Sequence, residues 1–394
     1  MDLETGRQPA PAAPRIETFA LKFTGDGGVY LGVWLVNLLL MVVTLGLYTP
    51  FARRRTLKYF YAHTVVAGSP LEFTGGLRRM VIGFLLFAAL YLAYVIASTT
   101  EQDLTTGLLL AGWLLITPWL WASATRFRLA STRWRGIHFN FAGRTREAYA
   151  ASWPYLGILG VGALVGVAVG LGGSRGKPSV ALLLLALAAA LVGLLYFVVR
   201  LEFNYTRLRV QRTDFGGQAG RWKPELKDFL RITAAAFGLF VAACAVFGTV
   251  IGLAVWMLWE TRPVSKGALI AVGVLAPFAM LLLAYLSLSP ALAYREARKF
   301  VLVWDKAGLG GLARFRSSLQ PWAFVRLRFR NLLLTIVTGG FYRPFAVTSE
   351  YRMKLESLTL YVKGGLDEVV GRLATPQGAF ADAMGDAVGF DVVG

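Results

Sequence analysis

Long apolar runs alternate with shorter polar stretches along this chain of 394 residues. A helix needs about 20 predominantly apolar residues to cross the hydrocarbon core of a bilayer. Seven runs of the chain reach this length, whereas one further run, at 331–342, has only about half of it and follows three arginines. We expect a re-entrant or interfacial element at this shorter run. The pattern predicts an all-α polytopic membrane protein, a helical bundle of about 6–8 membrane segments. The full-length runs are 29–48, 80–99, 105–124, 155–172, 180–199, 233–259 and 268–289.

The composition supports this class. Hydrophobic residues make up 56% of the chain and charged residues 16%, with a mean hydropathy of +0.57. In a soluble protein the net charge of +19 would point to nucleic acid. Here the basic residues lie between the apolar runs, so we expect anionic lipid headgroups as partners and no nucleic acid.

The basic residues also predict an orientation. Most of the 41 Lys and Arg residues fall in four alternate segments, 49–79, 125–153, 200–232 and 290–330, which the positive-inside rule places in the cytoplasm. Seven spans would then put the N-terminus outside. Alternatively, 29–48 is a half-inserted hairpin that matches 331–342, the N-terminus lies inside, and six segments span fully.

The polar ends of the chain frame one membrane domain. The Pro/Ala-rich start predicts a disordered tail at 1–22, without the apolar core of a cleaved signal peptide. We assign 23–363 to a transmembrane domain built from repeats and 364–394 to a C-terminal tail. Cys244 is the only cysteine, so no disulfide can form within the chain.

The stretch 49–75 recurs along the sequence. A shift of 68 residues aligns Thr49-Pro50-Phe51 with Thr117-Pro118-Trp119, and the match continues to Arg78 and Arg146. Less complete copies begin near Arg200, Ser289 and Arg343. The match of the last copy to the first also continues upstream of Arg343, as far as Asn331, which aligns with Asn37. These matches predict internal repeats.

Four copies place a basic residue eight positions after a proline. Proline removes a backbone donor and kinks a helix, while eight residues advance a helix by about 12 Å, toward the lipid phosphates. The predicted kinks are Pro50, Pro118, Pro290 and Pro344, together with Pro277, which lies in mid-span and would point to a midplane cavity. The candidate lipid-headgroup anchors are Lys58, Arg126, Arg200, Arg298 and Arg352.

After the basic residue, the pattern changes from helical to alternating. Leu71-Glu72-Phe73, Phe139-Asn140-Phe141 and Thr213-Asp214-Phe215 place a polar residue before the final aromatic, which is typical of a strand with one buried face. Gly68 and Gly136 would turn the chain. We therefore expect short cytoplasmic β-hairpins that form a small cap below the helical bundle.

Candidate chemistry is sparse. The six spanning runs between residues 80 and 289 contain no Asp, Glu, Lys, Arg or His, whereas coupled carriers usually need an ionisable group or a broken helix at the midplane. Motifs of P-loop nucleotide sites, zinc peptidases and serine hydrolases are missing from the sequence. His63 and His138 occupy non-equivalent repeat positions. We expect no catalytic residues, no metal and no cofactor, and therefore no enzyme.

Three polar residues near or within apolar runs remain as candidates. Asn37 and Asn331 share a repeat position. Their amides would either bond neighbouring helices or line a common polar cavity on two matching re-entrant elements. Glu202, close to Arg200, is expected to form an intramolecular ion pair, with a polar entry site as the alternative.

The residues Phe23-Thr24-Gly25, Asn37 to Leu40 and Thr44 to Ala52, followed by Gly68 and Phe73-Thr74-Gly75, resemble the YjgN-like family of bacterial inner-membrane proteins, a domain of unknown function. The resemblance extends over nearly the whole chain. It implies a multi-pass protein of the bacterial inner (cytoplasmic) membrane. Genes of relatives often lie beside one for a membrane metallopeptidase, which the resemblance therefore implies as a candidate partner. It implies no activity and no site residues.

Two functions fit these observations. The first is a non-enzymatic membrane component whose basic cytoplasmic face binds lipid or protein, as the repeated anchors and the lack of charge within the spans indicate. The alternative is a permease or lipid-translocating transporter without a buried coupling carboxylate, favoured by the paired re-entrant elements.

Overall fold

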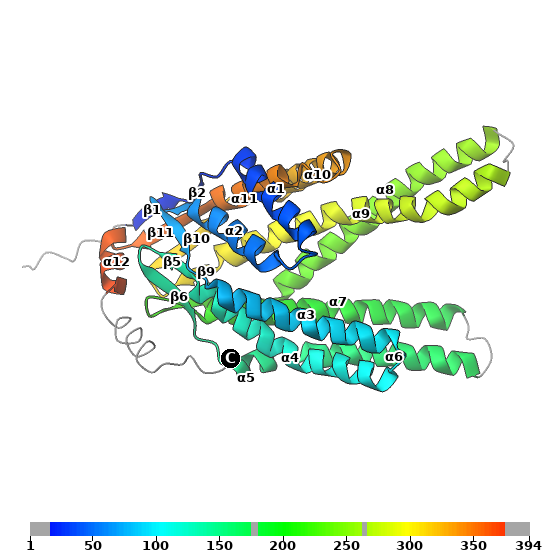
Figure 1. Cartoon of the computed structure of the whole chain (residues 1–394), viewed down its shortest axis with the longest axis horizontal. Helices are drawn as coiled ribbons and strands as arrows, with labels where there is room; N and C mark the ends of the chain where they lie inside the picture. The colour runs from blue at the N-terminus through cyan, green and yellow to red at the C-terminus, as the bar shows by residue number, and fades with distance from the viewer. Residues whose placement is uncertain (1–15, 175–179, 262–265, 375–394) are drawn as a thin grey trace, which may run out of the picture.

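Pairs of helices alternate with short strands along the chain, and the strands gather at one end of the molecule (Figure 1). The computed structural model describes residues 16–174, 180–261 and 266–374. The long helices extend from the strand end to the opposite end, as the ribbon in Figure 1 shows.

The helices of the described chain are arranged as successive pairs, and each pair contacts the next. Because α11 also contacts α1, the helices form a ring. The pairs are α1 (Gly27–Val43) with α2 (Thr49–Ala62); α3 (Leu77–Thr99) with α4 (Asp103–Ala130); α5 (Thr145–Ala151) and α6 (Pro154–Ser174) with α7 (Val180–Gln211); α8 (Leu226–Thr261) with α9 (Lys266–Asp305); and α10 (Pro321–Val337) with α11 (Arg343–Glu356). The helix α12 (Leu366–Ala374) follows.

Six helices of the described chain are long and apolar enough to cross a membrane. They belong to the three middle pairs. The helices α1 and α10 have 17 residues each, and their partners α2 and α11 have 14 each. Residues 29–48, the first run of the seven-span interpretation, contain the shorter apolar helix Gly27–Val43, so the helix lengths favour the alternative with six full spans. The lengths agree with six spans flanked by two shorter elements.

All 11 strands of the described chain join into one antiparallel sheet, in the order β1-β11-β10-β9-β8-β7-β6-β5-β4-β3-β2. Four pairs of consecutive strands form hairpins, β3/β4, β5/β6, β7/β8 and β9/β10, and each hairpin pairs with the next. The strands are β1 (Ile16–Ala20), β2 (Lys22–Phe23), β3 (Thr64–Val66), β4 (Ser69–Phe73), β5 (Thr132–Trp134), β6 (Ile137–Phe141), β7 (Thr213–Phe215), β8 (Gln218–Trp222), β9 (Ala307–Leu309), β10 (Ala313–Ser317) and β11 (Leu358–Lys363).

The sheet nearly closes on itself through its N-terminal strands. β1 pairs with β11, and β2 pairs with β3. Only Leu21 separates β1 from β2, and its backbone N–H donates to the carbonyl of Leu358 at 3.0 Å. One stretch of chain therefore joins the two ends of the strand order, and closure pairs backbone groups that an open edge would expose.

The expectation of an all-α protein is wrong, because the described strands form an 11-stranded sheet. The predicted hairpins exist, and Gly68 and Gly136 turn them with φ of +78° and +82°. The hairpins pair with one another, however, as Leu71 of β4 opposite Trp134 of β5 shows. This pairing stabilises them, because isolated hairpins of three- to five-residue strands are marginal and leave unpaired edges.

Parts of both predicted tails are structured. Residues 16–22, within the expected disordered tail, contain β1 and the start of β2. Within the expected C-terminal tail, α12 packs through Leu366 against the sheet core. The rest of these tails, 1–15 and 375–394, lies outside the described residues.

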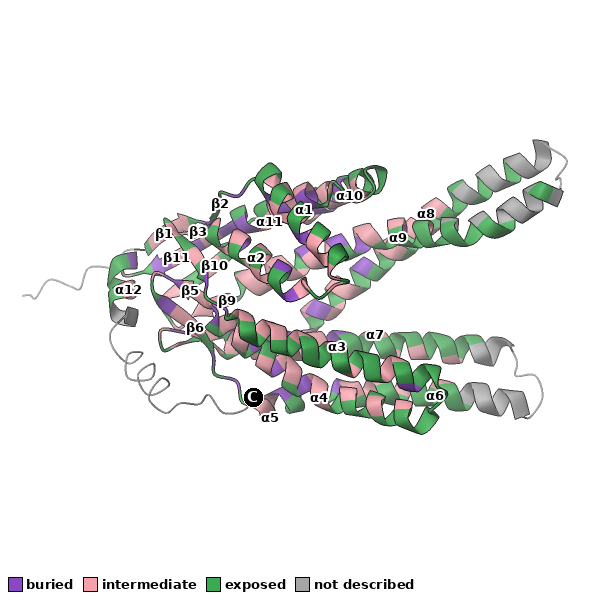
Figure 2. Ribbon diagram, viewed as in Figure 1, coloured by how far each residue is buried: buried purple, intermediate pink, exposed green. Residues whose placement is uncertain are grey.

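Apolar side chains from around the sheet meet in its interior. The buried cluster includes Phe23, Trp134, Phe215, Leu360 and Val362. The near-barrel is therefore filled like a small closed barrel whose side chains occupy its inside. Figure 2 shows the contrast with the outer parts of the long helices, which are largely exposed on the protein itself, as expected for surfaces covered by lipid.

A phenylalanine covers a glycine at three of the junctions where a strand leads into the next helix pair. A Cβ on each of these glycines would lie 2.4–2.5 Å from the phenylalanine ring two residues earlier. The missing side chain lets the ring fold back over the backbone. The pairs are Phe23 with Gly25, Phe73 with Gly75, and Phe141 with Gly143.

Candidate functional site

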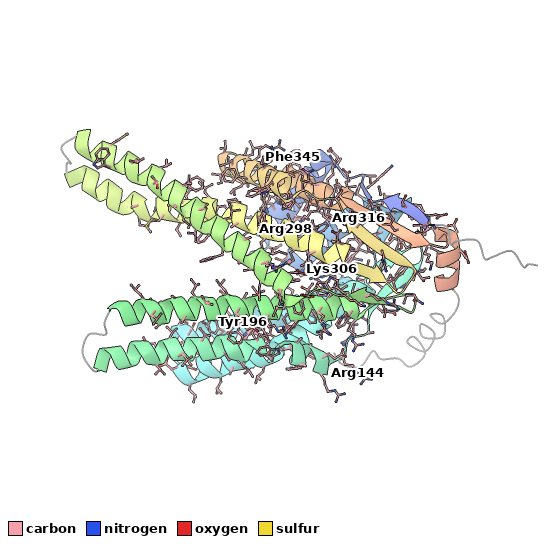
Figure 3. All side chains as sticks on the ribbon, turned by 180° about the vertical axis from the view of Figure 1, so that it is seen from behind. Arg144, Tyr196, Arg298, Lys306, Arg316 and Phe345 are labelled. Carbon is pink, nitrogen blue, oxygen red and sulfur yellow. The ribbon has the colours of Figure 1, made fainter. Side chains whose placement is uncertain are left out.

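Unpaired basic side chains surround the level at which the helices meet the sheet. They are exposed and make no side-chain hydrogen bond or ion pair with any residue of the described chain. Most of them lie within about two turns of the helix end next to the sheet, whereas Arg53 and Arg330 lie further along α2 and α10. Figure 3 labels Arg298 among them. We call this set the basic collar: Arg53, Arg55, Lys58, Arg78, Arg79, Arg146, Lys227, Arg231, Arg298, Arg326 and Arg330.

Two of the five predicted anchors, Lys58 and Arg298, belong to the collar. A third, Arg200, is half-buried between two rings, with its guanidinium 5.9 Å from the ring centre of Trp153 and 5.8 Å from that of Phe203. This cation–π geometry holds Arg200 within the protein.

The other two anchors bind the backbone at the strand-to-helix junctions. Arg126 donates to the carbonyl of Gly143 at 3.3 Å, and Arg352 donates to the carbonyl of Gly25 at 2.7 Å. Charge-assisted bonds of this kind are among the stronger protein hydrogen bonds. Although both side chains are exposed, their guanidinium groups have a structural partner that the repeat pattern did not reveal.

The predicted kinks fall into two classes. Pro118 lies inside α4, and Pro277 and Pro290 lie inside α9. Pro50 and Pro344 stand in the first turn of α2 and α11, where the N–H that proline lacks would have no helical partner. These two prolines begin a helix and do not kink one.

Asn37 and Asn331 each bridge the two helices of their own pair. Their exposed fractions are 4% and 1%. Asn37 donates to the carbonyl of Ala52, and Asn331 to that of Ala346, both at 3.4 Å. The interhelical interpretation fits this geometry, and the cavity beside Asn331 is not lined by Asn37, which opposes a common polar cavity.

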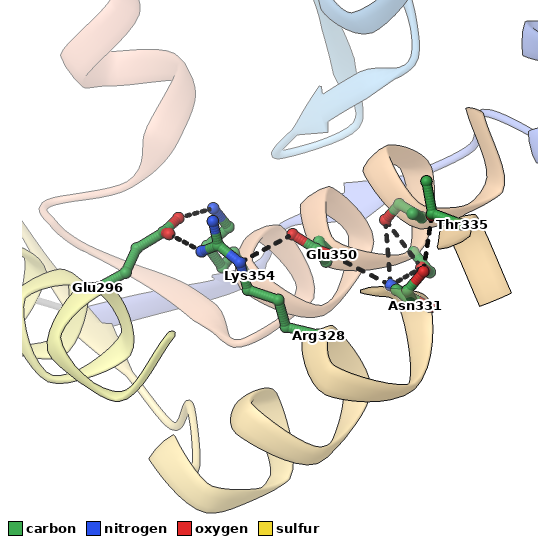
Figure 4. Close-up of polar contacts among 8 residues, drawn as sticks. Glu296, Arg328, Asn331, Thr335, Glu350 and Lys354 are labelled. Carbon is green, nitrogen blue, oxygen red and sulfur yellow. Dashed lines mark hydrogen bonds and ion pairs between the residues drawn. The ribbon is translucent and has the colours of Figure 1, made fainter. Parts of the chain in front are cut away.

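The cavity beside Asn331 lies between α9, α10 and α11 and has a volume of about 290 Å³. One wall is polar, with Arg328, Arg343 and Glu350, and the other is apolar, with Leu288 from α9. Arg328, Asn331 and Glu350 lie close together, as Figure 4 shows. The sequence offered a partial signal, because Arg328 and Asn331 are three residues apart and share a helix face.

Ion pairs connect this cavity to α9. Arg328 pairs with Glu296 and lies 4.0 Å from Glu350, and Lys354 lies 2.6 Å from Glu296 (Figure 4). Each of these four charges therefore has an opposite charge beside it. The chain of pairs fixes α10 and α11 relative to α9.

Glu202 forms the expected intramolecular ion pair, but with residues of another helix. Its carboxylate on α7 pairs with Arg295 and with Lys299, the latter at 2.5 Å, and both partners lie on α9. The exposed fractions of the three side chains lie between 23% and 34%. These two ion pairs join α7 to α9, although α8 lies between these helices in the sequence.

Replacement of Glu202 by glutamine is expected to destabilise the protein by about 1–3 kcal/mol, because two half-buried cations lose their counter-charge. The matched control is Asp367→Asn, since Asp367 is 96% exposed in its pair with Arg135 and should cost less than about 1 kcal/mol. Thermal unfolding of the purified proteins in detergent measures both. Equal melting temperatures for the two variants would contradict the expectation.

Neither His63 nor His138 lies in a metal-binding cluster of the described chain. Within it, no group of three or more His, Cys, Asp or Glu could hold a metal ion. His63 bonds the backbone carbonyl of Tyr59 through Nδ1 at 2.7 Å, as an ordinary structural histidine does.

Comparisons with known proteins agree with the membrane architecture. The family described as "Bacterial protein of unknown function (DUF898)" matches residues 18–387. "Inner membrane protein YjgN" of Salmonella typhimurium (strain LT2) is 31% identical over 134 residues, 33% of this chain and 33% of that protein. The proteins of the same name from Escherichia coli O157:H7 and strain K12 are 26% and 27% identical over 37% and 32% of either chain. The match thus spans about a third of each relative, and no solved structure matches the chain.

Proposed function

Since the chain belongs to the DUF898 family of bacterial proteins of unknown function, we propose its function from its own residues. It is a multi-pass protein of the bacterial inner membrane, as its six long apolar helices and the inner-membrane relatives show. The resemblance and the localisation derived from the sequence are confirmed.

We propose that the protein is a non-enzymatic membrane component that binds anionic lipid headgroups with its basic collar. The exposed, unpaired collar side chains at the sheet end are the observation that carries this proposal. The positive-inside rule places that end in the cytoplasm, where each basic residue near an anionic surface contributes about 1 kcal/mol of attraction.

We further infer that the chain consists of five copies of a helix pair followed by strands. The equal helix lengths of the first and last pairs, 17 and 14 residues, support this inference. So do the equivalent bonds of Asn37 and Asn331, each to a carbonyl 15 residues further on.

The transport alternative has weaker support. The interior of the near-barrel is filled by side chains, which opposes a path through the sheet. Asn37 does not line the cavity beside Asn331, which weighs against a polar chamber shared by the two short pairs. Association with a membrane metallopeptidase stays a prediction.

Neutralising the collar is expected to remove the preference for anionic lipid. The variant Lys58→Gln/Arg78→Gln/Arg79→Gln/Arg298→Gln should lower the ratio of phosphatidylglycerol to phosphatidylcholine that co-purifies from mixed micelles by about tenfold or more at low salt. Quantitative mass spectrometry of the bound lipids measures the ratio, and high salt should reduce it for the wild type.

The control for this experiment is Arg126→Gln/Arg352→Gln, because these two side chains bind backbone carbonyls. We expect that control to lose stability but to keep most of the lipid preference. An unchanged ratio in the collar variant would overturn the proposed function.

A further inference from the structure

The cavity between α9, α10 and α11 has the two-sided character of a site for an amphipathic molecule. Its apolar wall includes Tyr285, Leu288 and Leu292 of α9, which are exposed and extend from the spanning part of that helix. Its polar wall belongs to the short pair α10 and α11. The volume of about 290 Å³ suits a headgroup and the start of an acyl chain.

One positive charge in this cavity lacks a counter-charge. Arg328 is paired with Glu296, and Glu350 lies beside both Arg328 and Asn331. Arg343 is exposed at the cavity, and its guanidinium makes no hydrogen bond or ion pair with any residue in the described part of the chain. The cavity therefore favours a ligand with a net negative charge.

One buried acceptor in the same cavity lacks a donor. Asn331 is 1% exposed, and its Nδ2 donates to Ser349 Oγ at 3.0 Å and to Glu350 Oε1 at 3.2 Å. Its Oδ1 has no partner among the described residues. Buried acceptors in proteins are almost always satisfied, so this atom calls for a donor such as a hydroxyl group.

The first helix pair provides an internal comparison. At the positions that correspond to Arg343 and Glu350 it has Thr49 and Thr56. Asn37 donates only to Ala52, and its Oδ1, like that of Asn331, has no partner among the described residues, so the unpaired acceptor is shared by both pairs and only the charges beside it differ. The charged chemistry is therefore particular to the last pair and is not a general feature of the repeat.

We propose that this cavity binds one anionic phospholipid whose headgroup carries a free hydroxyl, as in a phosphatidylglycerol. The phosphate pairs with Arg343, a headgroup hydroxyl donates to Asn331 Oδ1, and an acyl chain lies along the apolar wall of α9. The proposal deepens the proposed lipid-binding function but uses no residue of the basic collar, so the two can fail separately.

The test compares lipids that differ by one group. Purified full-length protein is washed extensively in detergent, titrated with phosphatidylglycerol, phosphatidylpropanol or phosphatidylcholine, and analysed by native mass spectrometry. We expect one retained phosphatidylglycerol per chain, bound about fivefold more tightly than phosphatidylpropanol, which has the phosphate but no hydroxyl. Phosphatidylcholine should be bound more weakly still.

Matched variants assign the two contacts. Arg343→Gln should weaken retention of both anionic lipids by about tenfold, whereas Arg330→Gln, which removes a collar charge on α10, should leave the single retained lipid in place. Asn331→Ala should abolish the preference for phosphatidylglycerol over phosphatidylpropanol, and Asn37→Ala should preserve it.

Several results would overturn the proposal. Equal retention of phosphatidylglycerol and phosphatidylpropanol by the wild type would contradict the proposed hydrogen bond to Asn331. This measurement uses only the wild-type protein, so it does not depend on the folding of a variant. Equal retention by the wild type and Arg343→Gln would remove the ion pair. An unchanged ratio of phosphatidylglycerol to phosphatidylcholine in the collar variant, together with retention of the single lipid, would instead refute only the function proposed for the collar.

Discussion

Replacement of Gly220 by alanine is expected to destabilise the protein by about 3 kcal/mol, because the added methyl group has no room. The new Cβ would lie 2.0 Å from the carbonyl oxygen of Val210 and 3.3 Å from that of Thr213. Both obstacles are backbone atoms, so no side-chain rotation relieves the clash. Either the end of α7 or the strand β8 has to move.

A shift of β8 would affect more than one hairpin, since β8 pairs with β7 on one side and with β9 on the other. A nearly closed sheet has no free edge at which such a displacement can be absorbed. We therefore expect the loss to appear in global unfolding of the sheet end.

Thermal unfolding in detergent, followed by tryptophan fluorescence, measures the effect of Gly220→Ala. Gly76→Ala is the control, because Gly76 has a φ of −66° and open space where a Cβ would stand. A melting temperature for Gly220→Ala equal to that of Gly76→Ala would be inconsistent with a backbone clash.

Removal of the Phe324 side chain is expected to cost about 3–5 kcal/mol, the usual range for a large buried aromatic residue. Phe324 is 0% exposed and packs in a cluster with Ala293 and Ala297 of α9. Lys354 lies above its ring at 5.4 Å. The two alanines cannot close the hole that Phe324→Ala would leave between α9 and α10.

Trp322→Ala is the control for that variant, because Trp322 lies on the same helix and is largely exposed. We expect it to change the unfolding free energy by less than about 1 kcal/mol. Chemical or thermal unfolding of both proteins gives the comparison. A smaller loss for Phe324→Ala than for Trp322→Ala would show that α10 is not held to α9 as the structure has it.

Local patterns in the sequence were sufficient to predict the spanning helices and the positions of two turns. A long apolar run stabilises a helix in lipid whatever its neighbours are, so the segments from 80 to 289 could be recognised one by one. Gly68 and Gly136 marked turns because a positive φ is cheap for glycine. The strands after these turns followed from the alternation at 71–73 and 139–141.

The partners of the polar residues could not be predicted in the same way. Glu202 stands two residues from Arg200, yet it pairs with Arg295 and Lys299 on α9. The repeat marked Asn331 as equivalent to Asn37, but the neighbours that distinguish them, Ser349 and Glu350, reach Asn331 only through the packing of α10 against α11.

By itself, the sequence determined a basic, multi-pass membrane protein with recurring turns and strands, since helix formation in lipid, turn conformation and charge distribution are local properties. Only the tertiary structure decided that the strands join in one sheet and that the stretch 16–23 closes it. Ile16 pairs opposite Lys363, and Arg352 binds the carbonyl of Gly25 across 327 residues of chain. Contacts between such distant segments depend on the whole ring of helices that brings them together.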